Sequence, residues 1–84
     1  GFDIDLEPSG NMLFIKNNDV PGVVGKIGTI LGKMNINIAG YLLSRIEGND
    51  FAYAVIKVDS KVNSESIQKI NDFSEIIDII QLNI

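Results

Sequence analysis

The sequence contains no cysteine and no histidine. Without cysteine the chain forms no disulfide, and it lacks the cysteine pair that a metal chaperone needs. Without either residue the usual general bases and nucleophiles are missing, and serines such as Ser44 and Ser60 have no obvious activating partner. We therefore expect no catalytic residue and no metal site, which favours a binding or regulatory domain over a free-standing enzyme.

Basic residues and long apolar runs are also scarce. The 7 Lys and Arg residues against 11 Asp and Glu residues give a net charge of −4, and no basic cluster offsets it, which argues against a nucleic-acid partner. No apolar run approaches the roughly 18 residues of a membrane span, and nothing resembles a signal peptide, so we expect a cytoplasmic protein without a membrane partner.

Nucleotide-binding loops are missing as well. The sequence has no Gly-x-Gly-x-x-Gly motif, and the residue after the Gly25-Lys26 pair is Ile27, where a phosphate loop would have Ser or Thr. We therefore expect no cofactor within these residues.

The length of 84 residues predicts one small domain. Such a domain buries only roughly 60–65% of its extended surface, so its core is modest and association with another copy is favoured. The chain begins at Gly1 rather than Met, so we expect a piece of a longer protein. Residues 1–10 are expected to form a strand and turn that lead in from that parent, and residues 11–84 the domain itself.

The pattern of apolar residues predicts two helices and four strands after the lead-in. The acidic residues of the Phe2–Glu7 alternation are expected to form a solvated strand face rather than a metal site. The later elements, in order, are a strand over Met12–Lys16, a helix from Pro21 to about Met34, strands over Ile38–Ile46 and Phe51–Asp59, a helix capped by Asn63 and ending near Phe73, and a strand over Ile77–Leu82. This βαββαβ order predicts an α+β, ferredoxin-like fold with both helices on one face of an antiparallel sheet and an extra N-terminal strand.

The stretch from Asn17 to Ala39 is the most informative part of the chain. Pro21 suits the first position of a helix, and Val20 before it has no side-chain acceptor to cap the helix. A helix start without a cap attracts anions such as a carboxylate. The backbone N–H groups expected to be open there are those of Gly22, Val23 and Val24.

Polar residues border this helix on both sides. Asn17, Asn18 and Asp19 precede it, and Asn37 stands at the start of the next strand. A small zwitterion suits such surroundings, although an ordinary turn and helix start explain the same residues.

The first helix also carries Gly25, Gly28 and Gly32 on one side. Each glycine costs up to about 1 kcal/mol relative to alanine inside a helix. We expect close backbone contact there with a sheet, a ligand or a twin helix.

The motifs NNDVPGVVG at 17–25, ILG at 30–32 and NINIAG at 35–40 resemble the signature of the ACT domain, a family that binds amino acids and regulates metabolic enzymes. The run NIAGYLLSR at 37–45 is similar to the C-terminal regulatory domains of the D-3-phosphoglycerate dehydrogenase family. The resemblance implies L-serine as ligand, allosteric regulation of serine biosynthesis, and NAD bound only by the catalytic domains of an oxidoreductase parent. An L-serine dehydratase parent and a pure dimerisation module are the alternatives.

The resemblance also implies a shared ligand site in a homodimer. The ligand would lie between the first loop and helix of one chain and the second strand of its neighbour. Asn17 and Asp19 match the polar loop positions, and Asn37 matches the asparagine at the strand entry. Dehydrogenases of the family often have histidine where Asn17 stands and asparagine where Asp19 stands, so Asp19 adds a negative charge that suits an ammonium group. The dimer is expected to form through the apolar strand Ile38–Ile46 and the glycine side of the first helix, with two sheets joined edge to edge.

Overall fold

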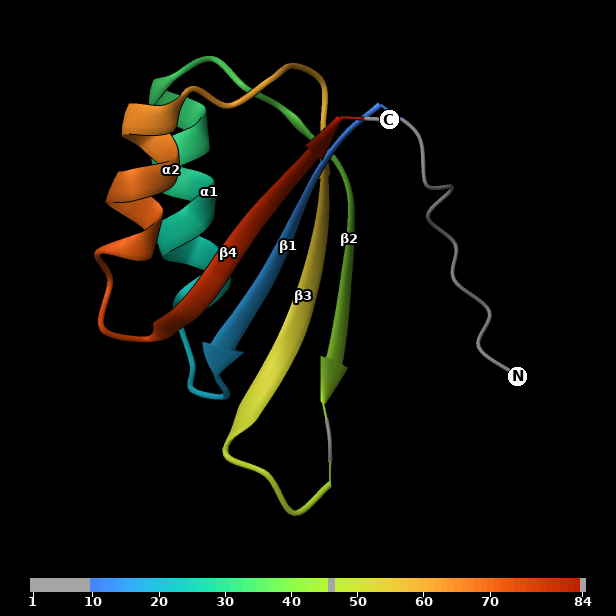
Figure 1. Ribbon diagram of the computed structural model, residues 1–84, viewed down its shortest axis with the longest axis vertical. Helices are drawn as coiled ribbons and strands as arrows, with labels where there is room; N and C mark the ends of the chain where they lie inside the picture. The colour runs from blue at the N-terminus through green and yellow to red at the C-terminus, as the bar shows by residue number, and fades with distance from the viewer. Residues whose placement is uncertain (1–9, 46, 84) are drawn as a thin grey trace.

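A computed structural model of the chain describes residues 10–45 and 47–83, and the lead-in strand predicted over Phe2–Glu7 lies outside this part (Figure 1). The described residues form, in order, β1 (Asn11–Asn18), α1 (Val23–Lys33), β2 (Ile38–Arg45), β3 (Phe51–Val58), α2 (Ser64–Asn71) and β4 (Ile76–Asn83). The predicted βαββαβ order is confirmed, and each predicted strand overlaps the observed one.

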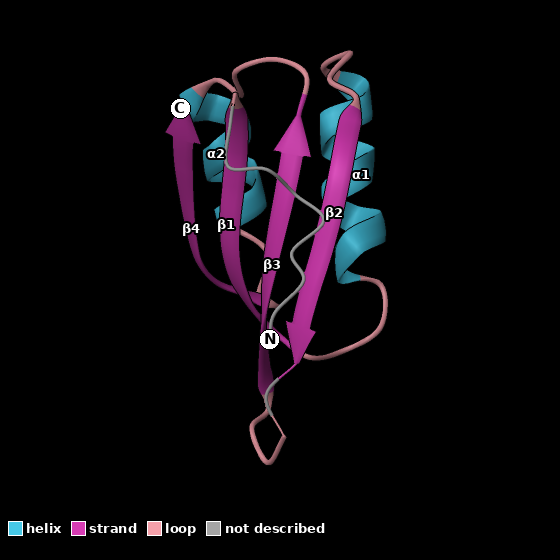
Figure 2. Cartoon of the chain, turned by 90° about the vertical axis from the view of Figure 1, so that its right-hand side faces the viewer, coloured by secondary structure: helices cyan, strands magenta, loops and turns pink. Residues whose placement is uncertain are grey.

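The strands form one antiparallel sheet with the order β2-β3-β1-β4, so β2 and β4 are its edges (Figure 2). In β1 the register places Leu13 opposite Ile56 of β3 and Ile15 opposite Ala54. The pairing of β1 with β4 shifts between Lys16 and Asn17, where both strands approach the loop before α1.

Both helices cover the same face of the sheet, as the sequence pattern predicted (Figure 1). Alternate residues of β1 and β3 point into this layer because strand side chains alternate between faces. The buried residues at its centre include Leu13, Ile15, Ile27, Leu31, Ile56 and Ile70. Asn17 is on the same face of β1 as Leu13 and Ile15. Its polar side chain is therefore buried on the helix-covered face, near the end of the strand.

The start of α2 and the end of α1 agree with the sequence. Asn63 caps α2, because its side-chain Oδ1 accepts a hydrogen bond of 2.8 Å from the backbone N–H of Ser66. After α1, Asn35 adopts the left-handed conformation with φ 58°, which asparagine tolerates better than most residues.

The start of α1 differs from the prediction. The first helical residue is Val23 rather than Pro21, and Gly22 is the N-cap, with φ 90° and ψ −8°. These angles are those of the third residue of a type II turn, where glycine is favoured and proline commonly precedes it. The Pro21-Gly22 pair therefore turns the chain into the helix instead of beginning the helix.

The glycines of α1 do not approach the rest of the described chain closely. A Cβ built on Gly25, Gly28 or Gly32 would meet no heavy atom within 4 Å outside its own helix turn in this part of the chain. The expected close contact with the chain's own sheet is therefore wrong. Contact with a ligand or a twin helix stays a prediction.

Candidate functional site

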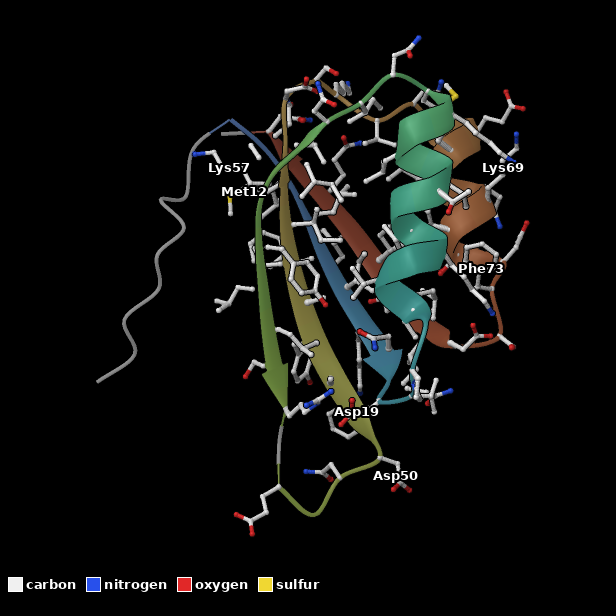
Figure 3. All side chains as sticks on the ribbon, turned by 180° about the vertical axis from the view of Figure 1, so that it is seen from behind. Met12, Asp19, Asp50, Lys57, Lys69 and Phe73 are labelled. Carbon is white, nitrogen blue, oxygen red and sulfur yellow. The ribbon has the colours of Figure 1, made fainter. Side chains whose placement is uncertain are left out.

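A cavity of about 170 Å³ lies between the start of α1, the loop before it and the inward face of β2. Its walls contain five of the six ligand-binding residues predicted from sequence, namely Asn17, Asp19, Gly22, Val23 and Val24. They are joined there by Val20, Pro21, Gly25, Tyr41, Leu43 and Arg45. Figure 3 shows Asp19 between the end of β2 and the start of α1.

Asn17 lines this cavity and carries a buried side-chain acceptor without a partner among the described residues. Asn17 is only 4% exposed, and its side-chain Nδ2 donates a hydrogen bond of 2.9 Å to the carbonyl of Asn18. Its Oδ1 is buried and has no hydrogen-bond partner among the described residues. A buried acceptor without a partner costs about 1–3 kcal/mol, so the position favours a donor supplied by a ligand.

The start of α1 supplies donors to the same cavity. The first bond inside the helix runs from the Lys26 N–H to the Gly22 carbonyl at 3.1 Å. The N–H groups of Val23, Val24 and Gly25 thus precede the first helical bond, and Gly22 has no side chain that could cap them. The open donors begin one residue later than the sequence predicted, because the helix begins at Val23.

Asp19 forms an ion pair across the cavity that the sequence did not reveal. The Arg45 Nε donates to the Asp19 Oδ1 at 3.0 Å, and the backbone N–H of Asp19 donates to the Asp50 carbonyl at 2.9 Å. The Asp19 side chain is 30% exposed and that of Arg45 is 69% exposed. The pair therefore lies at the mouth of the cavity and joins the loop before α1 to the end of the edge strand.

The wall formed by β2 consists of Tyr41, Leu43 and Arg45, which alternate along the strand and share its inward face. Burial raises the pKa of the Tyr41 hydroxyl, and the nearby Arg45 charge partly opposes this shift. None of these three residues was predicted from the sequence to belong to the site. Their alternation along the strand was the only sequence pattern that placed them on one face. An apolar edge strand without a binding site shows the same alternation, so the pattern did not identify the site.

A second ion pair fastens the start of α1 to the turn before β4. Lys26 pairs with Glu75, and its Nζ lies over the Phe73 ring at 5.4 Å from the centroid. The hydrogen bond from Lys26, helped by one from Ser74, holds the pKa of the Glu75 carboxyl below its usual value. The carbonyl of Glu75 also accepts a 2.7 Å bond from the Asn18 N–H, so this turn supports the loop beside the cavity.

Asn37 is not part of the cavity within one chain. It precedes β2, whereas Arg45 at the cavity ends that strand, a separation of roughly 25 Å at the usual rise of a strand. The Asn37 backbone exchanges two bonds of 3.1 Å with Asp59, one from its N–H to Oδ1 and one to its carbonyl.

Residues 10–45 and 47–83 contain neither a metal-binding cluster nor a membrane-spanning helix. This part holds no group of three or more acidic, histidine or cysteine side chains able to bind a metal ion. None of its helices combines the length and the apolar character needed to cross a membrane.

The chain is similar in sequence to one known family and in fold to solved structures of that family. The sequence profile of the ACT domain matches residues 11–75. In a solved structure, the ACT domain from GTP pyrophosphokinase of Chlorobium tepidum, the fold is similar, with a TM-score of 0.63 at 14% identity over 88% of this chain and 97% of that one. This likeness concerns the fold alone.

Curated relatives share the sequence over most of its length. D-3-phosphoglycerate dehydrogenase of Bacillus subtilis is 30% identical over 79 residues, which are 94% of this chain and 15% of the relative. The enzyme of the same name from Methanocaldococcus jannaschii is 31% identical over 84 residues, which are 100% of this chain and 16% of the relative. The chain thus spans about 15% of the length of the curated relatives it matches.

Proposed function

The chain belongs to the ACT domain family, a family of regulatory modules, and from this premise we propose that it binds L-serine and regulates a phosphoglycerate dehydrogenase to which it is joined. The ligand would occupy the cavity between the loop before α1 and the inward face of β2. The observation that carries the proposal is the buried Asn17 Oδ1, which lacks a partner among the described residues beside an open helix start.

The two ends of an amino acid match the two kinds of group in the cavity. Its carboxylate fits the N–H groups of Val23, Val24 and Gly25, where the helix dipole favours negative charge. Its ammonium or hydroxyl group fits the acceptors of Asn17 and Asp19.

The size of the cavity favours a small side chain. Its volume of about 170 Å³ is several times the roughly 30 Å³ that one water occupies in the liquid, so the cavity admits a small molecule. This space suits serine better than a bulky aromatic amino acid.

Asn37 enters the proposal through a second copy of the chain. ACT domains generally dimerise. In the described sheet β2 is an edge strand, and no described strand pairs with its outer side. A dimer joined along β2 would cover this edge and could bring Asn37 of one copy to the cavity of the other, in keeping with a shared site. The parent's reaction, with NAD as its cofactor, belongs to domains beyond these residues.

Isothermal titration calorimetry on the verified dimer tests the proposal. L-serine should bind more tightly than glycine, L-alanine and D-serine, because these controls lack the hydroxyl group or present it from the wrong side. Asn37→Ala should weaken L-serine binding roughly tenfold to hundredfold, the loss expected for one buried polar contact. The substitution should leave the urea midpoint nearly unchanged.

Absence of binding heat for every amino acid at several temperatures would leave dimerisation as the function. Unchanged serine affinity in Asn37→Ala would refute the shared site but not the cavity.

A further inference from the structure

The cavity contains one charged side chain of each sign. Among its lining residues these are Asp19 and Arg45, which pair through Nε and Oδ1 at 3.0 Å. The bond to Oδ1 uses one of the five N–H donors of the Arg45 guanidinium, so other donors are left for a ligand. The Asp19 carboxylate can likewise accept a further bond at its second oxygen. The charges of the cavity walls therefore sum to zero while both signs face a ligand.

We propose that Arg45 is a specificity-determining residue, which neutralises Asp19 and thereby makes the cavity select zwitterionic amino acids over cationic amines. This inference rests on the proposed function and adds the charge class of the ligand and the residue that sets it. Arg45 was not assigned to the site from sequence, and its contribution follows from its ion pair and its place in the cavity wall.

Asp19 places a negative charge at the mouth of the cavity. A carboxylate at the mouth of a small cavity attracts any ammonium group, with or without a carboxylate on the same molecule. Without a counter-charge, Asp19 and the Asn17 Oδ1 would attract the ammonium group of a simple amine as well as that of an amino acid, and only the start of α1 would favour the carboxylate.

Arg45 changes this balance in two ways. Its positive charge offsets the attraction of Asp19 for a bare cation, and it adds a second positive influence, beside the N-terminus of α1, for a ligand carboxylate. A zwitterion gains from both charges, whereas a cationic amine gains from one and is repelled by the other.

The position of the pair suits this purpose better than a purely structural one. The Arg45 side chain is 69% exposed, and exposed ion pairs contribute little to stability. The loop that carries Asp19 has independent support, since the Asp19 N–H bonds to the Asp50 carbonyl and the Asn18 N–H bonds to the Glu75 carbonyl. The ion pair is therefore not required to hold the loop in place.

The test compares L-serine with L-serinamide, which keeps the ammonium and hydroxyl groups but has no carboxylate. Calorimetry gives the affinity ratio of the two ligands for the wild-type dimer and for Arg45→Gln and Asp19→Asn. Both variants break the same ion pair, so a structural role would change the ratio equally in both. The proposal predicts opposite changes.

In Arg45→Gln the uncompensated Asp19 should hold serinamide better and serine less well, so the preference for serine should fall at least about tenfold. In Asp19→Asn the uncompensated Arg45 should repel serinamide, so the preference for serine should rise. Arg45→Lys keeps the charge and should keep most of the wild-type ratio. Lys69→Gln on α2 removes one positive charge far from the cavity and is the matched control.

A ratio that stays unchanged in Arg45→Gln, or moves in the same direction in both variants, would overturn the proposal. A wild-type dimer that binds neither ligand would instead reject the proposed function itself. Circular dichroism of each variant establishes that it is folded, and Asp19→Asn and Arg45→Lys carry the test if Arg45→Gln does not fold.

Discussion

Asn17 holds a buried side-chain acceptor that the described chain leaves without a partner. The companion amide Nδ2 is satisfied by the Asn18 carbonyl, so the residue is fixed in place while its oxygen is left for another donor. An unpaired acceptor lowers the stability of the free protein and strengthens the binding of a ligand that satisfies it. At the residue scale, the site therefore gains affinity at the expense of stability.

This balance predicts the effect of Asn17→Leu. The substitution removes the unpaired oxygen and keeps a similar shape on the inward face of β1, so the free energy of unfolding without ligand should rise by about 1 kcal/mol. Serine binding should weaken roughly tenfold to hundredfold, because one buried acceptor is lost. Urea denaturation and calorimetry on the same protein measure the two effects.

Asn63 provides the contrast for this experiment. Its Oδ1 is satisfied by the Ser66 N–H, so Asn63→Ala should destabilise the protein by about 1 kcal/mol and leave serine binding unchanged. If Asn17→Leu also destabilised the protein, the oxygen would have a partner in solution.

Several residues of the cavity could be predicted from the sequence, and others could not. Asn17 and Asp19 were predicted because they match the polar loop positions of the ACT domain, just before a helix start without a side-chain cap. Arg45 follows 26 residues after its partner Asp19 in the chain, and a pairing over that separation depends on how β2 lies beside the loop. No local pattern in the sequence specifies it.

At the scale of the elements, the helix starts show what local rules can predict. The cap of α2 was predicted correctly because Asn63 and Ser66 lie within a single turn. The start of α1 was wrong by two residues because proline is favoured both at the first helical position and at the second position of a type II turn. The left-handed Gly22 decides in favour of the turn.

The glycine side of α1 leads to a prediction about Gly28→Ala. Within the described chain the added methyl group meets no heavy atom within 4 Å outside its own helix turn, and alanine is favoured inside a helix. The isolated chain should therefore be stabilised by up to about 1 kcal/mol. If this side of the helix faces a second copy, the same methyl group should weaken the dimer. Sedimentation equilibrium and urea denaturation at low protein concentration separate the two effects.

Asn71→Ala at the end of α2 is a control for helix propensity away from the glycine side. It should leave the dimer constant unchanged. A Gly28→Ala protein that dimerises like wild type would place the dimer contact elsewhere, and the edge of β2 would then be the surface to alter next.

At the scale of the whole molecule, the sequence predicted the fold because every element carries its own period. Strands with alternating residues and helices with three-and-four spacing leave few arrangements open, and the βαββαβ order selects the observed sheet. The cavity is a property of this arrangement, since it forms only where the end of β2 meets the loop before α1. Sequence periodicity specifies the elements but not the space between them.

We propose that an amino acid binds where this loop, the start of α1 and the inward face of β2 meet. A ¹⁵N-¹H correlation spectrum recorded during titration with L-serine tests it most directly, because each amide reports on its own surroundings. The largest shifts are expected at the backbone amides of Val23, Val24 and Gly25 and at the side-chain amide of Asn17. Unchanged signals at these groups, or the largest changes at Tyr53 and Ile80 on the opposite face of the sheet, would contradict it.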